Sequence, residues 1–315
     1  MQAAVVNVLG QPPRYESFAE PELKDGEVLV KVRAVGLHPI VKAVAAGKHY
    51  SFTGEVPMIP GVDGVGTLED GARVVFGNVR KPWGPMAELA AVPRSALIPL
   101  PEGIDDATAA AIGNPGMSAW VSQKRAGLQA GETVLILGAT GVAGQLAIQI
   151  ARLNGAKRVI AVGRNVDALR GANADAVIAL GQPEDAVRDA FAAEAAAGID
   201  VVIDYLWGRP TELLLEALGK GYRATATHPT RLVEVGESAG PTITLTGSVM
   251  RSVDLTILGS GFGAARLDEI FASIPKLFDA AAKGILTIDV DKVPLADVEA
   301  AWGRSEKGRR IVFTL

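Results

Sequence analysis

A glycine-rich turn near the middle of the chain has the clearest chemical meaning. An apolar run, Thr133 to Leu137 (TVLIL), leads directly into GATGVAG, and a segment with helical spacing follows. This AxGxxG pattern stands where dinucleotide-binding proteins have GxGxxG, between a strand and a helix as the motif requires. Gly141 lets the backbone approach a pyrophosphate, the N–H groups at the helix start supply donors, and Gly144 permits close packing of helix on strand. The turn therefore predicts a dinucleotide site, whose members are Gly138, Ala139, Thr140, Gly141, Val142 and Ala143.

The next predicted strand indicates which dinucleotide would bind. Arg158 to Val162 (RVIAV) is followed by Gly163-Arg164-Asn165. NAD-binding proteins place an acidic residue at the end of this strand, about 20 residues beyond the glycines, to hold the ribose 2′-hydroxyl. No carboxylate stands there, because Asp167 comes too late, and Arg164 can pair with a 2′-phosphate through charge-assisted hydrogen bonds. We therefore expect NADPH, contacted by Gly163, Arg164 and Asn165; the alternative is that Arg164 is only a solvated loop residue.

The residue types that are missing exclude several kinds of catalysis. The chain has no cysteine, so disulfides, thiolate nucleophiles and thiolate-bound zinc are excluded. Its three histidines, His38, His49 and His228, lack the HExxH spacing, so we expect no metal site. None of the four tyrosines is the first residue of a YxxxK pair, which excludes the catalytic arrangement of short-chain dehydrogenases.

Composition and charge exclude other classes of protein. The chain has 315 residues, of which 49% are hydrophobic and 21% charged, enough for two domains with apolar cores. The chain has a net charge of −4 and so lacks the excess of basic residues that is typical of nucleic-acid-binding proteins. The N-terminal MQAAVVNVLG has no signal-peptide pattern, and no apolar stretch has the length of a membrane span. We expect a soluble, cytoplasmic protein that binds neither nucleic acid nor membrane.

The glycine turn must be positioned by a sheet, and the second half of the chain has the pattern that builds one. Six short apolar runs lie at 133–137, 158–162, 176–178, 200–203, 231–235 and 255–258. Helical patterns separate them, for example over 184–197. This alternation predicts an α/β fold with a doubly wound parallel sheet.

The two ends of the chain have a different sequence pattern. Short β-like runs at 28–35, 73–76 and 97–100, broken by proline and glycine, predict a compact, mainly β domain. The segment from Asp105 to Gly127 is helical in pattern, with Asp105 as its N-cap and Gly127 as its stop. Two further helices are predicted over 265–284 and 295–306. The closing run RIVFTL has no partner at the end of a completed parallel sheet, so we expect it to return to the N-terminal β domain.

Taken in order, these segments resemble the medium-chain dehydrogenase/reductase superfamily, and within it the zinc-independent branch of quinone oxidoreductases that includes the zeta-crystallins. The resemblance is carried by GEVLVKVRAVGLHPIVKAVAAGKHY, PMIPGVDGVG, AAIGNPGMSAWVSQKRAGLQAGETVLILGATGVAGQLAIQIARLNGA, VDLTILGSGFG and KGRRIVFTL. It implies a GroES-like catalytic domain over 1–114 plus 263–315, with a Rossmann domain over 115–262 inserted in it, and a cleft where they meet. It also implies a homodimer joined through the last strands of the Rossmann sheets, around Val253 to Leu258.

Departures from the family pattern are informative. Zinc alcohol dehydrogenases have a catalytic cysteine after the strand that VLVKVRAVG resembles, and a GHE motif where this chain has Gly61-Val62-Asp63-Gly64, so zinc-assisted catalysis is excluded. Quinone reductases usually have GVNP where this chain has Gly36-Leu37-His38-Pro39. The family asparagine lies near the nicotinamide, so His38 is a candidate catalytic residue that could contact cofactor or substrate and donate a proton. A structural histidine before Pro39 is the alternative.

The resemblance assigns further site residues. Tyr50, in a GKHY segment with one extra residue, matches a tyrosine that points into the substrate cleft, where it could bind the substrate oxygen or form an aromatic wall. Ser118 stands where relatives usually have threonine near the nicotinamide. Trp207 departs from the family's usual small residues; we expect it to be a packing residue, and the alternative is that it narrows the cleft. The loops that flank the nicotinamide contain Val235, Gly236, Ser260, Gly261 and Phe262.

These features favour one reaction. Without a metal, a cysteine or a YxxxK pair, the site has little means of activating an alcohol. We expect hydride transfer from C4 of NADPH to an acceptor that is already electrophilic, a quinone or an α,β-unsaturated carbonyl compound. Tyr50, His38 or backbone N–H groups would meet the developing negative charge. Two alternatives stay open: an NADPH-binding redox sensor or crystallin-like protein with little turnover, and an enoyl-thioester reductase.

Overall fold

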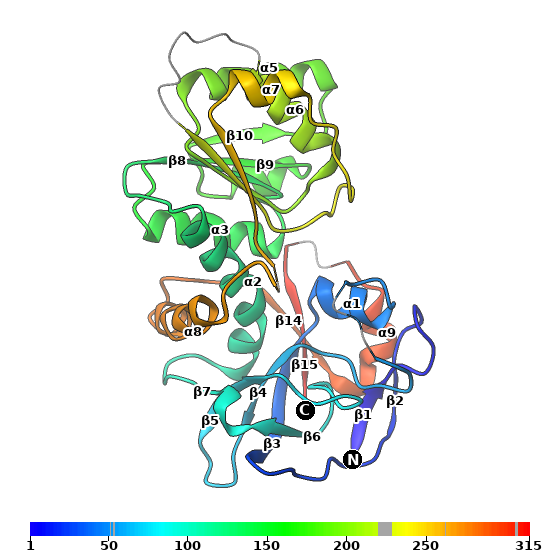
Figure 1. Cartoon of the computed structure of the whole chain (residues 1–315). Helices are drawn as coiled ribbons and strands as arrows, with labels where there is room; N and C mark the ends of the chain where they lie inside the picture. The colour runs from blue at the N-terminus through cyan, green and yellow to red at the C-terminus, as the bar shows by residue number, and fades with distance from the viewer. Residues whose placement is uncertain (51, 53, 220–228, 262, 306–307) are drawn as a thin grey trace. The chain divides into compact units, whose positions relative to one another are not determined.

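The chain forms two compact units in a computed structural model. The structure describes residues 1–50, 52, 54–219, 229–261, 263–305 and 308–315. One unit consists of Met1–Pro115 together with Ile274–Leu315, and the other consists of Gly116–Ser273 (Figure 1). The domain bounds expected from the sequence, 1–114 plus 263–315 and 115–262, stay a prediction.

The first unit is built on a seven-stranded sheet. Its strands lie in the order β14 (Val290–Pro294), β15 (Arg310–Thr314), β3 (Glu27–Gly36), β4 (Asp63–Thr67), β5 (Arg73–Gly77) and β7 (Leu97–Pro99), while β6 (Leu89–Pro93) also pairs with β3. A two-stranded sheet of β1 (Gln2–Val5) and β2 (Arg14–Ser17) accompanies it. The runs predicted at 28–35, 73–76 and 97–100 correspond to β3, β5 and β7. In β3, exposed and buried side chains alternate from Leu29 to Ala34, as expected where one face covers a core.

The last strand returns to the beginning of the chain, as the sequence predicts. β15 pairs antiparallel with β3, with Phe313 opposite Val35, and parallel with β14. Phe313 and Ile311 are buried in the core of this unit beside Val35 and Leu37. The buried Arg310 donates a hydrogen bond of 2.8 Å to the carbonyl of Leu37, which fixes the chain just after β3.

Short helices complete the ends of this unit. α1 (Pro39–Ala45) follows β3 directly and begins with a proline, which is well suited to a first helical turn. The helix predicted over 295–306 is shorter in the structure: a 3₁₀ turn (Leu295–Asp297) leads into α9 (Val298–Trp302), which ends at Gly303. Glycine is a poor continuation residue, which explains the early stop.

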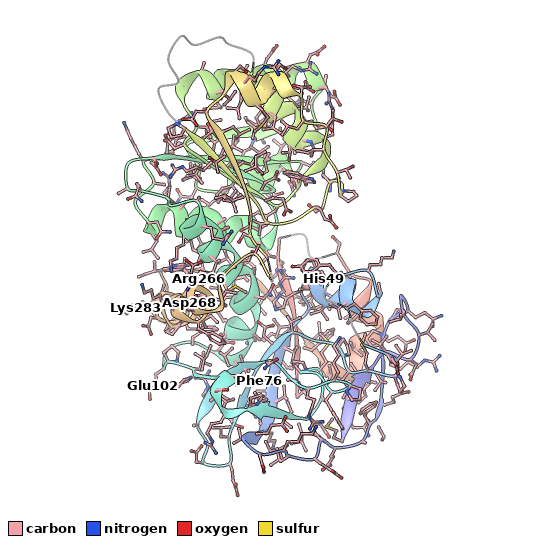
Figure 2. All side chains as sticks on the ribbon, viewed as in Figure 1. His49, Phe76, Glu102, Arg266, Asp268 and Lys283 are labelled. Atoms are coloured by element: carbon pink, nitrogen blue, oxygen red, sulfur yellow. The ribbon has the colours of Figure 1, made fainter. Side chains whose placement is uncertain are left out.

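Two longer helices begin with acidic side chains. α2 (Asp106–Arg125) is capped by Asp105, whose Oδ1 accepts hydrogen bonds from the backbone N–H groups of Ala107 and Thr108. The chain leaves this helix through Gly127, which has a φ of +64°. α8 (Leu267–Ala282) matches the amphipathic segment predicted over 265–284, and Arg266 pairs with Asp268 at its start (Figure 2).

The second unit contains the predicted doubly wound sheet. Its six parallel strands lie in the order β10 (Ala176–Ala179), β9 (Arg158–Gly163), β8 (Thr133–Leu137), β11 (Val201–Asp204), β12 (Thr230–Glu234) and β13 (Leu255–Gly259). The connecting helices are α3 (Val142–Leu153), α4 (Val166–Arg170), α5 (Glu184–Ala197), α6 (Gly208–Gly219) and α7 (Gly247–Ser252). All six predicted strands and the helix over 184–197 are confirmed.

Helices cover both faces of this sheet. α3 lies on one side, while α5, α6 and α7 lie on the other (Figure 1). On the latter face, Leu135 and Leu137 of β8 form a core with Phe191 of α5, Leu214 of α6 and Val249 of α7. Because both faces are covered, the central strands β8, β9 and β11 are largely apolar, which made them visible in the sequence. Among the helices of the described ranges, none combines the length and apolar character of a membrane span.

The close contact between α3 and the glycine turn yields a stability prediction. A Cβ atom at Gly144 would lie 2.2 Å from the carbonyl oxygen of Gly138 and 2.7 Å from Cα of Ala139. Because both are backbone atoms, Gly144→Ala must push the helix away from the strand, and we expect the free energy of unfolding to fall by about 1–3 kcal/mol. Urea unfolding measures this change. Gly303→Ala is the matched control, since Gly303 has a φ of −84° and no atom within 4 Å of its virtual Cβ; equal losses in the two variants would contradict the prediction.

Candidate functional site

The carboxyl ends of the parallel strands form one continuous edge in the second unit. The N–H groups of Gly138 and Ala139, at the end of β8, both bond the carbonyl of Val162 on β9 at 2.9 Å. On the other side, Val235 N bonds Asp204 O at 2.8 Å, and Ser260 N bonds Glu234 O at 2.8 Å. These bonds extend the sheet by one residue beyond each strand and hold the loops in register.

The edge contains a topological switch point between β8 and β11. From β8 the chain proceeds through β9 to β10 on one side, and β11 leads to β12 and β13 on the other. The connections at this point leave in opposite directions, which opens a crevice outside the strand ends where nucleotides bind in such sheets. The predicted glycine turn follows β8 and therefore lies at this crevice.

The glycine turn fits a pyrophosphate. Gly138 has a φ of +87°, a left-handed conformation that glycine adopts without strain. Gly141 is the N-cap of α3, and no side chain caps the helix there. A Cβ at Gly141 would meet only the carbonyl oxygen of Gly138, at 3.4 Å, so the space in front of the helix is open. The first-turn N–H groups, including those of Val142 and Ala143, are thus suited to an anion.

The residues expected at a 2′-phosphate follow β9. Gly163 ends the strand against Thr140, since a Cβ there would lie 2.9 Å from Thr140 Cγ2. Arg164 comes next and is exposed. The side chain of Asn165 has a structural task, because its Oδ1 accepts a hydrogen bond from the N–H of Ala168 and caps α4. Asp167 is exposed and pairs with Arg170.

The residues expected near the nicotinamide come from three segments of the same unit. Ser118 lies in α2, on the part of the helix that belongs to this unit. Val235 and Gly236 follow β12, and Ser260 and Gly261 follow β13, both at the carboxyl edge. Phe262 lies outside the described residues. The structure therefore brings the described cofactor residues of the sequence prediction into one unit, with the loop members at one edge.

Asp204 organises the turn after β11. Its carboxylate is fully buried and accepts hydrogen bonds from the N–H groups of Leu206 and Trp207, at 2.8 and 2.9 Å, and from the hydroxyl of Thr211. These bonds hold Trp207 at a φ of +52°, which is unusual for a bulky side chain. Burial raises the pKa of the Asp204 carboxyl above its ordinary value, and the three hydrogen bonds oppose that rise.

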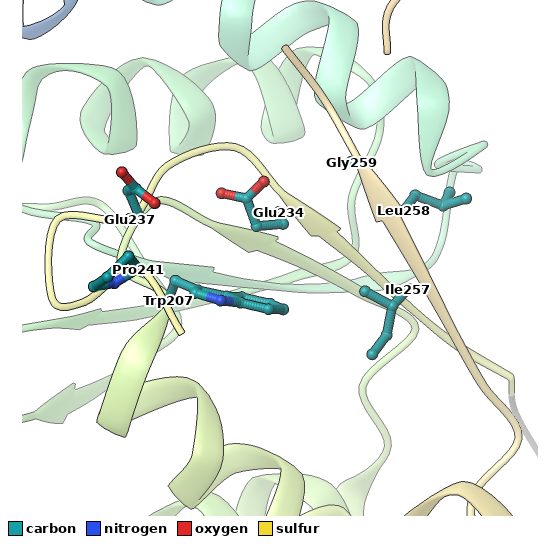
Figure 3. A pocket seen from close by; sticks show the side chains of 7 residues that line it. All are labelled: Trp207, Glu234, Glu237, Pro241, Ile257, Leu258 and Gly259. Carbon is teal, nitrogen blue, oxygen red and sulfur yellow. The ribbon is translucent and has the colours of Figure 1, made fainter. Parts of the chain in front are cut away.

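A cavity of about 300 Å³ lies beside this turn (Figure 3). Its lining consists of Trp207, Glu234, Glu237, Pro241, Ile257, Leu258 and Gly259. Burial is the main reason that the pKa of Glu234 is raised, and the negative charges of Asp204 and Glu237 add to the effect. The indole that the sequence singled out thus forms one wall of an acidic cavity in the second unit.

His38 forms a buried pair with Asp63 in the first unit. The imidazole follows β3, is completely buried, and has its Nε2 atom 3.2 Å from Oδ1 of Asp63, the first residue of β4. Neither ring nitrogen completes a hydrogen bond of normal geometry in this structure. The Asp63 side chain is 21% exposed, so the carboxylate lies nearer to the surface than the ring. Across the described residues, no group of three or more histidine, aspartate or glutamate side chains is placed to hold a metal ion.

Tyr50 lies beyond α1 in the same unit and is 70% exposed. Its ring packs against that of His49, with 4.2 Å between the centroids and a tilt of 32°. Figure 2 shows His49 beside α1. Tyr50 and His38 thus differ in accessibility, one being exposed and the other enclosed.

Sequence reasoning missed two groups in these sites. Asp63 was considered only for its lack of zinc-ligand character, and its contact with His38 joins two segments that are distant in sequence. Tyr205, directly after Asp204, was noted only as a tyrosine without a partner lysine. The departure of the nearby Trp207 from the family pattern was the only sequence signal that this segment differs from its relatives.

The buried carboxyl at the end of β11 predicts a pH effect on stability. Because the folded state holds the Asp204 proton more tightly than the unfolded state, stability falls as pH rises from the ordinary aspartate range, about pH 4, through the raised pKa. Asp204→Asn removes this contribution and also weakens that of Glu234, whose raised pKa depends in part on the negative charge of Asp204. We expect the thermal midpoint of the variant to fall less than that of the wild type between about pH 4 and about pH 7. The exposed Asp254→Asn control should follow the wild type; parallel curves for all three proteins would contradict the prediction.

Comparisons with known proteins agree with this architecture. Residues 24–102 match the model of the alcohol dehydrogenase GroES-like domain. The chain is 26% identical over 354 aligned residues to a probable NADPH-dependent quinone reductase, tdiC, of Emericella nidulans, covering 99% of each chain. A 175-residue match to the chloroplastic NADPH-dependent alkenal/one oxidoreductase of Arabidopsis thaliana is 31% identical and covers 49% of this chain and 45% of that protein.

A solved structure is similar over the whole length. The quinone oxidoreductase of Thermus thermophilus is 30% identical, with a TM-score of 0.76 and full coverage of both chains. Its identity and coverage support kinship as well as a shared fold, and the GroES-like match accounts for the first unit. The resemblance predicted from the sequence is confirmed. The chain belongs to the zinc-independent quinone oxidoreductase branch of the medium-chain dehydrogenase/reductase superfamily.

Proposed function

We propose that this protein is an NADPH-dependent reductase that transfers a hydride to a quinone or to an α,β-unsaturated carbonyl compound. The observation that carries the proposal is the uncapped glycine turn at the switch point, followed on the next strand by the exposed Arg164. The family supports the reaction class, since relatives are named as quinone reductases and as an alkenal/one oxidoreductase.

The second unit supplies the groups that would hold the cofactor. The first-turn N–H groups of α3 would bind the pyrophosphate, and Arg164 would pair with the 2′-phosphate. The residues around the nicotinamide half would be Ser118, Val235, Gly236, Ser260 and Gly261. When bound, NADPH supplies a hydride from its C4 carbon.

The first unit supplies two candidates for the proton that must accompany the hydride. Tyr50 is exposed and would hydrogen-bond the acceptor oxygen directly, giving its phenol proton as negative charge develops. His38 is enclosed and would act through Asp63, whose carboxylate is partly exposed. Either arrangement completes a two-electron reduction in which the acceptor gains one hydride and one proton.

The test is NADPH oxidation followed at 340 nm with a panel of acceptors. We expect turnover with 1,4-benzoquinone, 9,10-phenanthrenequinone or a simple enone, and the best acceptor would choose between the two classes. Tight NADPH binding without turnover on any of them would instead favour the redox sensor or crystallin-like alternative. Exclusive turnover of crotonyl-CoA would favour the enoyl-thioester reductase.

Removing the proposed phosphate partner should change cofactor choice. Arg164→Ala loses a charged hydrogen bond to the 2′-phosphate, so we expect NADPH to bind about ten- to a hundredfold more weakly while NADH affinity stays the same. Fluorescence titration measures both affinities. Arg170→Ala is the matched control, because Arg170 is an exposed arginine paired with Asp167 one turn away. Equal weakening of NADPH and NADH would show that Arg164 does not read the phosphate.

Removing the proposed proton donor should slow turnover without weakening cofactor binding. Tyr50→Phe keeps the ring but loses the hydroxyl, and we expect kcat with an enone to fall about a hundredfold. The Kd for NADPH should be unchanged. His38→Asn, which restores the amide that the family usually has, tests the other candidate in the same assay. Full turnover in both variants would exclude proton donation by either side chain.

A homodimer is also part of this proposal. β13 is the edge strand of its sheet, and pairing of two such strands would cover an open ladder of backbone donors and acceptors. Light scattering measures the expected dimer mass.

We infer that the protein is located in the cytoplasm, where NADPH is available to it.

A further inference from the structure

We propose that Tyr205 is a positioning residue of the cofactor site, whose buried phenol hydroxyl donates a hydrogen bond to Ser118 Oγ and so leaves the Ser118 proton for the nicotinamide half of the cofactor. This inference rests on the proposed function for the identity of the cofactor. It assigns a task to a polar group that the hydride-transfer chemistry does not use.

The backbone of Tyr205 lies at the switch point itself. Its N–H donates a hydrogen bond of 3.1 Å to the carbonyl of Leu137, the last residue of β8. A Cβ at Gly138 would lie 3.2 Å from the Cβ of Tyr205, and one at Gly236 would lie 3.4 Å from its carbonyl oxygen. Tyr205 therefore packs between the glycine turn and the loop after β12, two segments that carry predicted cofactor contacts.

Hydrogen bonds on both sides of Tyr205 fix its backbone. The Asp204 carboxylate accepts hydrogen bonds from the N–H groups of Leu206 and Trp207, and the Tyr205 carbonyl accepts a bond of 2.8 Å from Ser238 Oγ. With the backbone held at this point, the side chain has few directions available. It reaches toward α2, where its hydroxyl faces the side chains of Ser118 and Ser122.

The phenol hydroxyl is buried and completes no hydrogen bond of normal geometry in this structure. A buried hydroxyl without a partner is costly, and most such groups in native proteins are satisfied. The side chains of Ser118 and Ser122 are the partners at hand. Burial also raises the pKa of Tyr205, so the phenol keeps its proton and acts as a donor.

The directions of the hydroxyl protons decide what Ser118 can do. Ser122 Oγ donates to the carbonyl of Ala119 at 3.1 Å, so its proton is already used within the helix. When Tyr205 donates to Ser118 Oγ, the Ser118 proton must turn away from the phenol. It is then available to an acceptor outside the cluster, and the carboxamide oxygen of a nicotinamide is an acceptor of that kind.

A double-mutant cycle on NADPH affinity tests this coupling. Tyr205→Phe and Ser118→Ala should each weaken NADPH binding about three- to tenfold, the range of one hydrogen bond. The double variant should be no weaker than Ser118→Ala alone, because Tyr205 acts only through that serine. Ser118→Thr keeps a hydroxyl and should retain both wild-type affinity and sensitivity to Tyr205→Phe. The control is Tyr15→Phe, which removes an exposed phenol in the first unit and should leave affinity unchanged.

A second measurement reports on the phenol without replacing it. In protein labelled with ¹³C at the tyrosine ζ position, the Tyr205 signal should shift when NADPH binds to the wild type and should not shift in Ser118→Ala. The proposal is overturned if losses from the two single substitutions multiply in the double variant, or if the Tyr205 signal shifts equally with and without the serine hydroxyl. A wild-type protein that fails to bind NADPH would overturn the proposed function together with this inference, whereas normal NADPH binding without coupling would overturn this inference alone.

Discussion

The pairing of β8 between β9 and β11 is the constraint on which the rest of the second unit depends. Leu135 lies opposite Ile160 on one side and opposite Val202 on the other, in parallel register. Because the chain winds outward in both directions from these three strands, the crevice at their carboxyl ends has a fixed place. The glycine turn follows β8, Asp204 is the last residue of β11, and Tyr205 comes directly after it.

The same edge shows how the fold manages buried polarity near a binding surface. The Asp204 carboxylate could have been a liability in an apolar sheet, yet three donors satisfy it and it holds the turn that carries Trp207. Glu234 lacks such support and borders a cavity, where burial and, to a smaller extent, the neighbouring carboxylates raise its pKa. Negative charge therefore gathers on the side of the sheet away from β9, and the exposed arginine Arg164 follows β9 itself. This separation of charge along one edge supports our proposal that the cofactor phosphates bind near the glycine turn and Arg164.

Local sequence patterns predicted the framework well. Most strands of the parallel sheet are apolar runs bounded by glycine or polar residues, so hydrophobic continuity located them; β12 (TRLVE) is less apolar than the others. The glycine turn was equally visible, since close approach of backbone to backbone at Gly144 admits no other residue without strain. The return of the closing strand followed from its lack of a partner, and β15 indeed pairs with β3.

The parts that escaped prediction are side-chain contacts between distant segments. Nothing near His38 in the sequence points to Asp63, because the two meet only when β3 and β4 are placed in one sheet. The approach of Tyr205 to Ser118 likewise depends on how α2 packs. Local patterns also exaggerated the second C-terminal helix, since its periodicity continues past Gly303 while the backbone does not.

The pairing of β15 with β3 also bears on the order in which the protein can fold during synthesis. The second unit is one uninterrupted stretch of chain, so all its strands have been made before translation reaches the last segment. The first unit must wait for Arg310–Thr314 before its sheet can close between β14 and β3. Until then the ladder of β3 lacks one neighbour and part of its core is open to water. A nascent chain would thus hold a complete parallel sheet while the first unit is still incomplete, and emergence of β15 from the ribosome becomes the step that completes the first unit.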